Sequence, residues 1–134
     1  MSVFTAEEIK YLNEQRLGRL ATVGADGRPH VVPTSFRYNP QADAIDIGGM
    51  GAFSKTKKYR DVRATGRAAL VVDDVQPPWQ ARGIEIRGQA ETLETGGQEI
   101  MERFNPEIIR IVPRRIVSWG IDGEPTRPNA RNVR

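Results

Sequence analysis

Apolar and polar residues alternate along several short stretches of the chain, which is the period of strands with one buried face. Residues 19–23 and 29–38 form the first pair, joined by a glycine-containing turn, and they predict a β-hairpin. Residues 44–47 and 83–91 alternate in the same way. Residues 67–73 are apolar at nearly every position, so we expect that strand to be buried on both faces, at the centre of a small barrel or against a partner subunit.

Prolines modify this pattern. Pro33 lies inside the second strand and removes a backbone donor from the ladder, so we expect an edge, a bulge or a ligand at that point. A proline loop is expected at 75–82. Pro106 and Pro113 are expected to break up the chain before a last strand at 114–121.

The N-terminal segment carries the signals of a helix start. Thr5 and Glu8 have the spacing of a capping box, in which each side chain accepts from the other residue's backbone N–H. Phe4 and Ile9 have the spacing of a hydrophobic staple. We expect this helix to dock on the strands and to end at Gly18.

Two more helices are expected. The second helix follows the glycine-rich run at 48–51, with Ser54 or Thr56 as its N-cap and Gly66 as its stop. The third helix begins with a capping box formed by two polar residues and carries three apolar ones. These five residues are Thr95, Gln98, Ile100, Met101 and Phe104.

The elements amount to about six antiparallel strands and three helices. We therefore expect a mainly β fold, a small antiparallel barrel with flanking helices, in one domain spanning residues 1–134. Residues 122–134 are rich in proline, arginine and asparagine, and they predict a tail that is disordered or covers a ligand groove.

Composition narrows the classes of function. With no cysteine and a single histidine, His30, the chain lacks the ligands of a thiolate or histidine-based metal site, and we expect no metal. No apolar run approaches the length of a membrane span, and the N-terminus has no signal-peptide pattern, so we expect a cytoplasmic protein without a membrane partner. Aromatic residues make up 7% of the chain and have no spacing suited to stacking on bases, which argues against nucleic acid.

The start of the second helix carries an unusual concentration of positive charge. Lys55, Lys57 and Lys58 crowd this end, and no acidic residue precedes Asp61. The helix dipole is already positive there, so each lysine costs on the order of 0.3–1 kcal/mol. Backbone N–H groups, a hydroxyl and ammonium groups converging at one point predict a site for a phosphate or carboxylate. The alternative is a solvated basic helix end.

Side chains for cofactor-free catalysis are scarce. There is no G-x-S-x-G elbow, and the acidic residues are scattered. If the chain is an enzyme, a cofactor supplies the reactive atom and the protein supplies orientation and anchoring. Tyr38 and His30 are candidate proton donors, although packing explains each of them more simply, and no catalytic residue is assigned.

An ordered set of segments resembles the split-barrel flavin-binding superfamily that includes the pyridoxamine-phosphate oxidases. Within it, the chain is most similar to the actinobacterial branch of coenzyme F420-dependent enzymes. The segments are 19–23, 26–33, 56–62, 77–79, 82–88 and 115–121. This resemblance implies a homodimer of split barrels, with the cofactor in a groove between the subunits.

The resemblance also implies three groups of cofactor contacts. The phosphate end would be held at the basic helix start by Thr56 and Lys58, with Lys57 and Ser54 nearby. The ring would lie near Pro33, Thr34, Gly48 and Gly49. A loop from the partner subunit would close the groove, and the residues at that position are Trp79 and Arg82.

The function implied is that of an F420-dependent reductase. The deazaflavin is strongly anionic, since it has a phosphodiester and an oligoglutamate tail, and in its reduced form it gives a hydride to an electron-poor double bond of a small molecule. Two alternatives stay open: an FMN-dependent oxidase or reductase on the same fold, and a non-catalytic binder of the deazaflavin.

Overall fold

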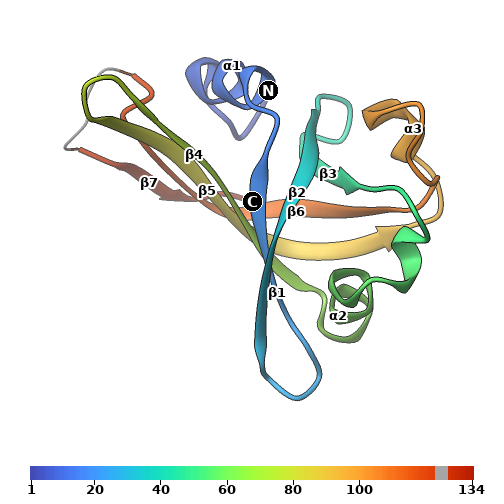
Figure 1. Cartoon of the computed structure of the whole chain (residues 1–134). Helices are drawn as coiled ribbons and strands as arrows, with labels where there is room; N and C mark the ends of the chain where they lie inside the picture. The colour runs from blue at the N-terminus through green and yellow to red at the C-terminus, as the bar shows by residue number, and fades with distance from the viewer. Residues whose placement is uncertain (123–126) are drawn as a thin grey trace.

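Six antiparallel strands close into a barrel because β3 pairs with β2 on one side and with β6 on the other. The structure, a computed structural model, describes residues 1–122 and 127–134. The barrel strands are β1 (Gly18–Val23), β2 (Pro29–Asn39), β3 (Ala44–Gly48), β4 (Arg67–Gln76), β5 (Gln80–Leu93) and β6 (Ile108–Trp119). A seventh strand, β7 (Asn129–Asn132), adds to the edge of β6 (Figure 1). This architecture confirms the expected mainly β barrel.

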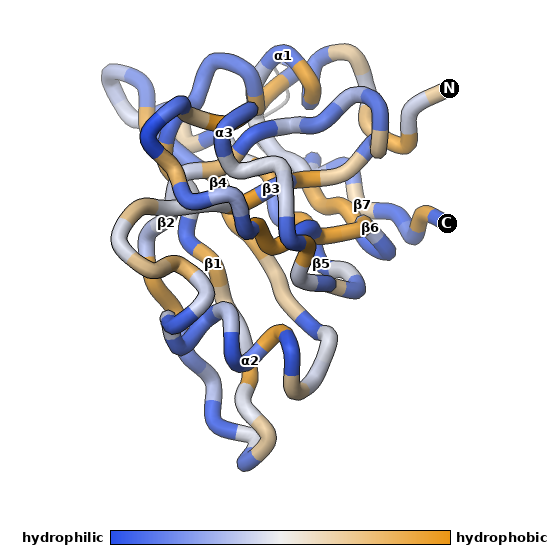
Figure 2. Tube along the Cα trace, turned by 90° about the vertical axis from the view of Figure 1, so that its right-hand side faces the viewer, coloured by the Kyte–Doolittle hydropathy of each residue, from blue (hydrophilic) through white to orange (hydrophobic). Residues whose placement is uncertain are grey.

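The barrel interior is filled by alternate residues of the strands, most of them aliphatic. The fully buried ones include Leu20, Ile45, Ile47, Leu70, Val72, Ile84, Ile86, Ile109, Ile111 and Ile116. Hydrophobic residues recur along β6, whereas strongly hydrophilic residues gather in several of the loops (Figure 2). No helix within the described residues is long and apolar enough to cross a bilayer.

Within one chain the strand buried on both faces is β3, whereas the expected segment 67–73 has one face partly exposed, so its burial against a partner subunit stays a prediction. In β4, Ala69 and Val71 are half-exposed, so this strand alternates. Every residue of β3 is buried. Asp46 lies on its outer face, where Arg110 forms a two-pronged ion pair with it at 2.7 and 3.1 Å. The side-chain partners of β3 therefore come from distant strands, and its own sequence does not reveal them.

The strand β2 changes partner along its length. Its residues 29–34 pair with β1, and residues 35–39 pair with β3. The half that contains Pro33 therefore has one open edge, as the proline predicted.

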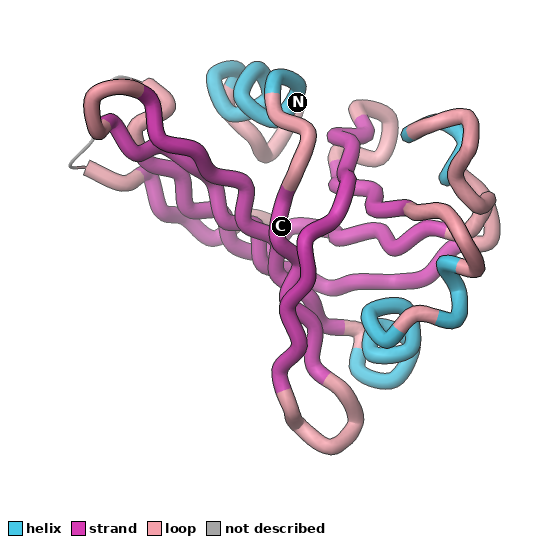
Figure 3. Tube along the Cα trace, viewed as in Figure 1, coloured by secondary structure: helices cyan, strands magenta, loops and turns pink. Residues whose placement is uncertain are grey.

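The helices lie outside the barrel (Figure 3). The first, α1 (Ala6–Glu14), has the predicted capping box between Thr5 and Glu8. It ends at Glu14 rather than at Gly18, which instead opens β1. A Cβ at Gly18 would lie 2.9 Å from the Leu70 side chain, so close packing accounts for this glycine. The helix α2 (Lys57–Thr65) ends at Gly66 with φ of 69°, as expected.

The third helix and the segment after it differ from the prediction. The helix α3 spans only Gly97–Ile100, and its N-cap is Gly96, with no side-chain cap. The capping box expected at Thr95 is absent because the chain folds tightly there: the Gly97 N–H donates to the Pro106 carbonyl. The strand β6 runs through Pro113, which sits at a bulge opposite Gly88.

The expected proline loop is shorter than 75–82, because β4 and β5 extend into it and leave a three-residue turn at 77–79. The stem of this hairpin is braced against α1. The Arg82 guanidinium binds Asp74 at 2.8 Å, and the Tyr11 hydroxyl donates to Asp74 at 2.6 Å.

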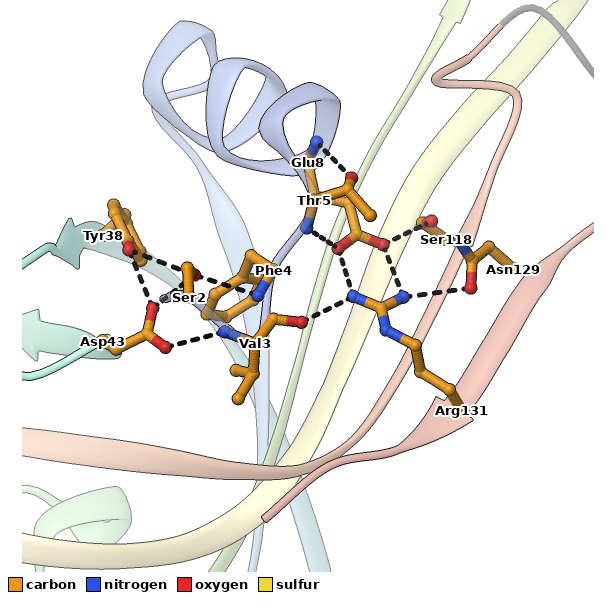
Figure 4. Close-up of polar contacts among 10 residues, drawn as sticks. All are labelled: Ser2, Val3, Phe4, Thr5, Glu8, Tyr38, Asp43, Ser118, Asn129 and Arg131. Carbon is orange, nitrogen blue, oxygen red and sulfur yellow. Dashed lines mark hydrogen bonds and ion pairs between the residues drawn. The ribbon is translucent and has the colours of Figure 1, made fainter.

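Residues 129–132 of the expected tail form β7 instead of a disordered segment, and residues 123–126 lie outside the described part. The Arg131 guanidinium donates to both carboxylate oxygens of Glu8, at 2.6 and 3.0 Å, and Ser118 adds a third bond at 2.7 Å (Figure 4). Burial raises the pKa of Glu8, but the hydrogen bonds from Arg131, Ser118 and the Thr5 amide outweigh it and lower that pKa. The pair therefore fastens β7 to α1.

Replacing Arg131 with Met is expected to lower the free energy of unfolding by about 3 kcal/mol at pH 7, because buried Glu8 loses its charged partner. Urea denaturation measures this. Arg127→Met, which removes an exposed tail arginine, is the matched control and should change stability by less than about 0.5 kcal/mol.

The pH dependence of this loss of stability tests whether the ion pair between Arg131 and Glu8 causes it. Because folding lowers the pKa of Glu8, the pair stabilises the fold above the unfolded-state pKa of about 4.3, and this contribution is lost as pH falls through the lower folded-state pKa. The deficit of Arg131→Met should therefore shrink at acid pH. A deficit that is the same at pH 7 and at pH 3 would contradict the ion-pair explanation.

Candidate functional site

The loop between β3 and α2 is held in one conformation by Asn105. Its side-chain oxygen accepts the Phe53 N–H at 2.8 Å, and its own N–H donates to the Gly49 carbonyl at 2.8 Å. Gly51 and Ala52 follow each other in the left-handed region, with φ of 69° and 63°. A non-glycine residue is uncommon there and marks a turn that the surroundings enforce. The loop then enters a short 3-10 helix, η1 (Phe53–Lys55), which leads into α2.

Thr56 is the N-cap residue of α2, as one of the two alternatives predicted, whereas Ser54 lies half-buried in η1. The Thr56 hydroxyl does not cap the helix, because it donates to the Phe53 carbonyl at 2.7 Å. No side chain caps the first turn of α2. The N–H groups of that turn therefore have no side-chain acceptor, which suits an anionic ligand.

Lys57 is engaged within the fold. Its ammonium lies 3.1 Å from the Asp61 carboxylate, one helical turn on, and the Thr22 hydroxyl of β1 donates to Asp61 at 2.8 Å. Burial raises the pKa of Asp61, but the hydrogen bonds from Thr22 and Lys57 outweigh it and lower that pKa. The charge of Lys57 is thus compensated before any ligand arrives.

Lys58 is in a different state. Its side chain is half-buried, and its ammonium lies 5.3 Å from the centre of the Phe53 ring. Burial lowers the pKa of Lys58, and no carboxylate pairs with it within the described residues. Lys55 is exposed. Among the three lysines, Lys58 is therefore the one that is partly desolvated and without a counter-charge, so an anion would compensate it most.

The predicted ring-binding glycines are required by internal packing. A Cβ at Gly48 would lie 3.0 Å from Phe104 and 3.1 Å from Ile100, and a Cβ at Gly49 would lie 3.0 Å from Phe53. Protein side chains therefore occupy the Cβ side of both glycines. A ligand ring would have to approach this segment from another side.

The open edge of β2 offers backbone groups to a ligand. In the register of the two strands, Pro29 lies opposite Val23 of β1, and Pro33 lies opposite Arg19. A proline has no N–H, so these two are pairs of opposite residues that exchange no backbone hydrogen bonds with each other. The polar groups of residues 29, 31 and 33 thus point away from β1. They comprise three carbonyls and the single N–H of Val31, whose side chain is 68% exposed. Thr34 differs from Pro33, since it is buried and its hydroxyl donates to the Ser35 carbonyl at 3.2 Å.

Trp79 and Arg82 do not join this site within one chain. The β4–β5 hairpin that carries them projects from the side of the barrel opposite α2 (Figure 1). Trp79 is 86% exposed at the tip. Arg82 is held by Asp74 and stacks on the Tyr11 ring at 4.9 Å, so its charge is already satisfied.

The two candidate proton donors lie in different surroundings. The Tyr38 hydroxyl donates to Asp43 at 2.8 Å, and burial together with Asp43 raises the pKa of Tyr38. His30 has a buried Nδ1 without a hydrogen-bond partner among the described residues.

Two residues that shape the candidate site, Asp61 and Asn105, were not identified from the sequence. The four-residue spacing of Lys57 and Asp61 is a signal that could have shown their pairing. Nothing in the sequence could have shown the contact of Asn105 with a loop 52 residues earlier.

A family model described as "Pyridoxamine 5'-phosphate oxidase" matches residues 4–119. The chain belongs to this family. A reductase of 5a,11a-dehydrotetracycline and 5a,11a-dehydrooxytetracycline from Streptomyces rimosus is 46% identical over 133 residues, which cover 97% of this chain and 93% of the relative. This relationship supports an oxidoreductase on this fold and confirms the family resemblance of the sequence.

Solved structures share the fold of this family member. A conserved hypothetical protein from Mycobacterium tuberculosis has a TM-score of 0.70 at 23% identity, with 90% of this chain and 87% of that chain covered. A FAD-binding protein from Mesorhizobium loti has a TM-score of 0.62 at 24% identity, with coverage of 86% and 93%. At these identities the likeness shows the fold alone.

Proposed function

We propose that the protein is a reductase that uses the reduced deazaflavin coenzyme F420 to saturate an electron-poor double bond of a small molecule. The observation that carries the cofactor proposal is the α2 start, which combines an uncapped first turn with the uncompensated ammonium of Lys58. The reductase proposal is supported by the 46% identical relative, which acts on dehydro compounds.

The residues present fit such a cofactor. Lys58 and the first-turn N–H groups of α2 are donors for a phosphodiester, and Thr56 and Ser54 lie beside them. The open edge of β2 presents a single N–H flanked by carbonyls, which suits a heteroaromatic ring edge that alternates acceptors and donors. These groups bind and orient a ligand, and none of them carries out chemistry on its own.

When bound, the reduced deazaflavin supplies the hydride. The chain's own contribution is to anchor the phosphate, to hold the ring edge along β2 and to limit access of water to the reacting face. The proton that completes the reduction is assigned to solvent, because the Tyr38 hydroxyl is committed to Asp43.

A homodimer is part of the proposal. The outer face of β1, β2 and β4 is apolar. It is partly exposed at Ala21, Ala69 and Val71 and 68% exposed at Val31, and its shallow groove is also lined by Arg67 and Arg87. A second copy on this face would bury apolar surface. The second copy could also bring its own Trp79 to the α2 start of the first chain, which Trp79 cannot reach within a single chain.

Lys58→Ala is expected to weaken deazaflavin binding about tenfold to a hundredfold, because it removes a desolvated, charge-assisted donor. Lys55→Ala removes an exposed lysine that lies one residue before Thr56 and two before Lys57. This change should weaken deazaflavin binding by less than about threefold. Fluorescence titration of the purified protein with deazaflavin, and separately with FMN, measures both effects. Equal losses in the two variants would reject the assigned site, and binding of FMN alone would favour an FMN enzyme.

Ala69→Glu is expected to convert a dimer into monomers, raising the dissociation constant at least about 100-fold, because it buries an unpaired charge in the interface. Ala69 lies opposite Arg87 on β5, which already pairs with Glu85 at 3.0 Å, so the new carboxylate is hydrated in the free monomer and unpaired once a second copy covers it. Analytical ultracentrifugation measures the change. Leu17→Glu, at a residue 50% exposed outside this face, is the control. A dimer that survives Ala69→Glu would place the interface elsewhere.

A further inference from the structure

The Asp61 carboxylate removes one positive charge from the α2 start. It holds the Lys57 ammonium at 3.1 Å, and it is itself fixed by the Thr22 hydroxyl at 2.8 Å. The Asp61 side chain is 5% exposed, whereas that of Lys57 is 47% exposed. Lys57 is therefore bound to a rigid, buried acid that compensates its charge, although its own side chain is half-exposed.

The charge left for a ligand can be counted. Lys58 contributes one positive charge, and the helix dipole contributes roughly half a charge at the first turn. Lys55 is exposed, so solvent screens most of its contribution. The local total is about one and a half positive charges. Without Asp61 the Lys57 ammonium would raise it to about two and a half, and that gain would favour a phosphomonoester, with about 1.5 to 2 negative charges at pH 7, more than a phosphodiester, with one.

We infer that Asp61 is a specificity-determining residue, which by masking Lys57 lowers the affinity of the α2 site for a doubly charged phosphomonoester more than its affinity for a singly charged phosphodiester. This inference rests on the proposed function and deepens it. The deazaflavin carries a phosphodiester, whereas FMN carries a phosphomonoester. Asp61 would thus discriminate between the two cofactor classes without contacting either.

A purely structural role of Asp61 gives a different expectation. The bond from Thr22 also anchors α2 to β1, so loss of Asp61 would loosen the helix. Loosening would weaken both phosphate types alike, because both use the same donors. A change in the charge of the site instead acts on each ligand in proportion to its own charge. The ratio of the two affinities therefore separates the two roles.

The test is a charge cycle of four proteins: wild type, Asp61→Asn, Lys57→Met and the double variant. Relative to wild type, the site gains one positive charge in Asp61→Asn, loses one in Lys57→Met and is unchanged in the double variant. Dissociation constants are measured by fluorescence for the deazaflavin cofactor and FMN. The deazaflavin without its phosphodiester and oligoglutamate tail, and riboflavin, are measured as well, so that the contribution of each phosphate-containing side arm is obtained by difference.

Asp61→Asn is expected to strengthen the phosphate contribution of FMN about tenfold and that of the deazaflavin cofactor about threefold, because the Coulomb energy scales with ligand charge. Lys57→Met is expected to weaken them by the same factors, since it leaves Asp61 unpaired. The double variant is expected to regain the wild-type ratio. Thermal unfolding monitors the fold of each protein.

A ratio that stays constant across the cycle overturns the inference while leaving the proposed function intact. Wild-type protein that binds neither cofactor overturns the proposed function, and the inference falls with it. If Asp61→Asn does not fold, the comparison of wild type with Lys57→Met decides, because Lys57 is half-exposed and its loss must still penalise FMN more than the deazaflavin.

Discussion

The barrel depends on one exchange of backbone hydrogen bonds, at the point where β2 leaves β1 and pairs with β3. This exchange lets β3 reach β6 and close the barrel, and it leaves residues 29–34 of β2 with an open edge. Pro29 and Pro33 sit where their missing N–H groups would have pointed into that edge. The same exchange sends the chain after β3 around the end of the barrel towards α2. The open edge and the basic helix start are thus two consequences of one topological step.

Four of the ion pairs among the described residues are of two kinds. Glu8, Asp46 and Asp74 are each held by one arginine whose guanidinium binds both carboxylate oxygens. These pairs join elements that are distant in the sequence or that belong to different strands. Arginine suits that work because its planar guanidinium fixes geometry as well as charge. Asp61 is paired instead with Lys57, a flexible point charge one helical turn away. The arginine pairs are therefore structural, whereas the lysine pair lies where the count of charges matters to a ligand.

The sequence predicted features that depend on local contacts and missed those that depend on distant ones. The capping box of Thr5 formed because both partners lie within one turn. The same pattern at Thr95 failed, because the fold joins Gly97 to Pro106 and leaves no room for a longer helix. The strand β7 could not be predicted from a proline- and arginine-rich stretch, since its ion pair to α1 spans 123 residues. Local propensity is overridden wherever a long-range partner satisfies the backbone or a charge better.

The same difference between local and distant contacts applies to the three lysines of the candidate site. The sequence placed three lysines at one helix start and could not rank them, because ranking requires knowing which lysine is buried and which is paired. The structure separates them into an exposed Lys55, a compensated Lys57 and a desolvated Lys58. Since one barrel serves proteins with different ligands, the fold alone does not choose the cofactor. That choice must come from individual side chains, and we propose that a single carboxylate, Asp61, contributes to it by setting the number of uncompensated charges at the α2 start.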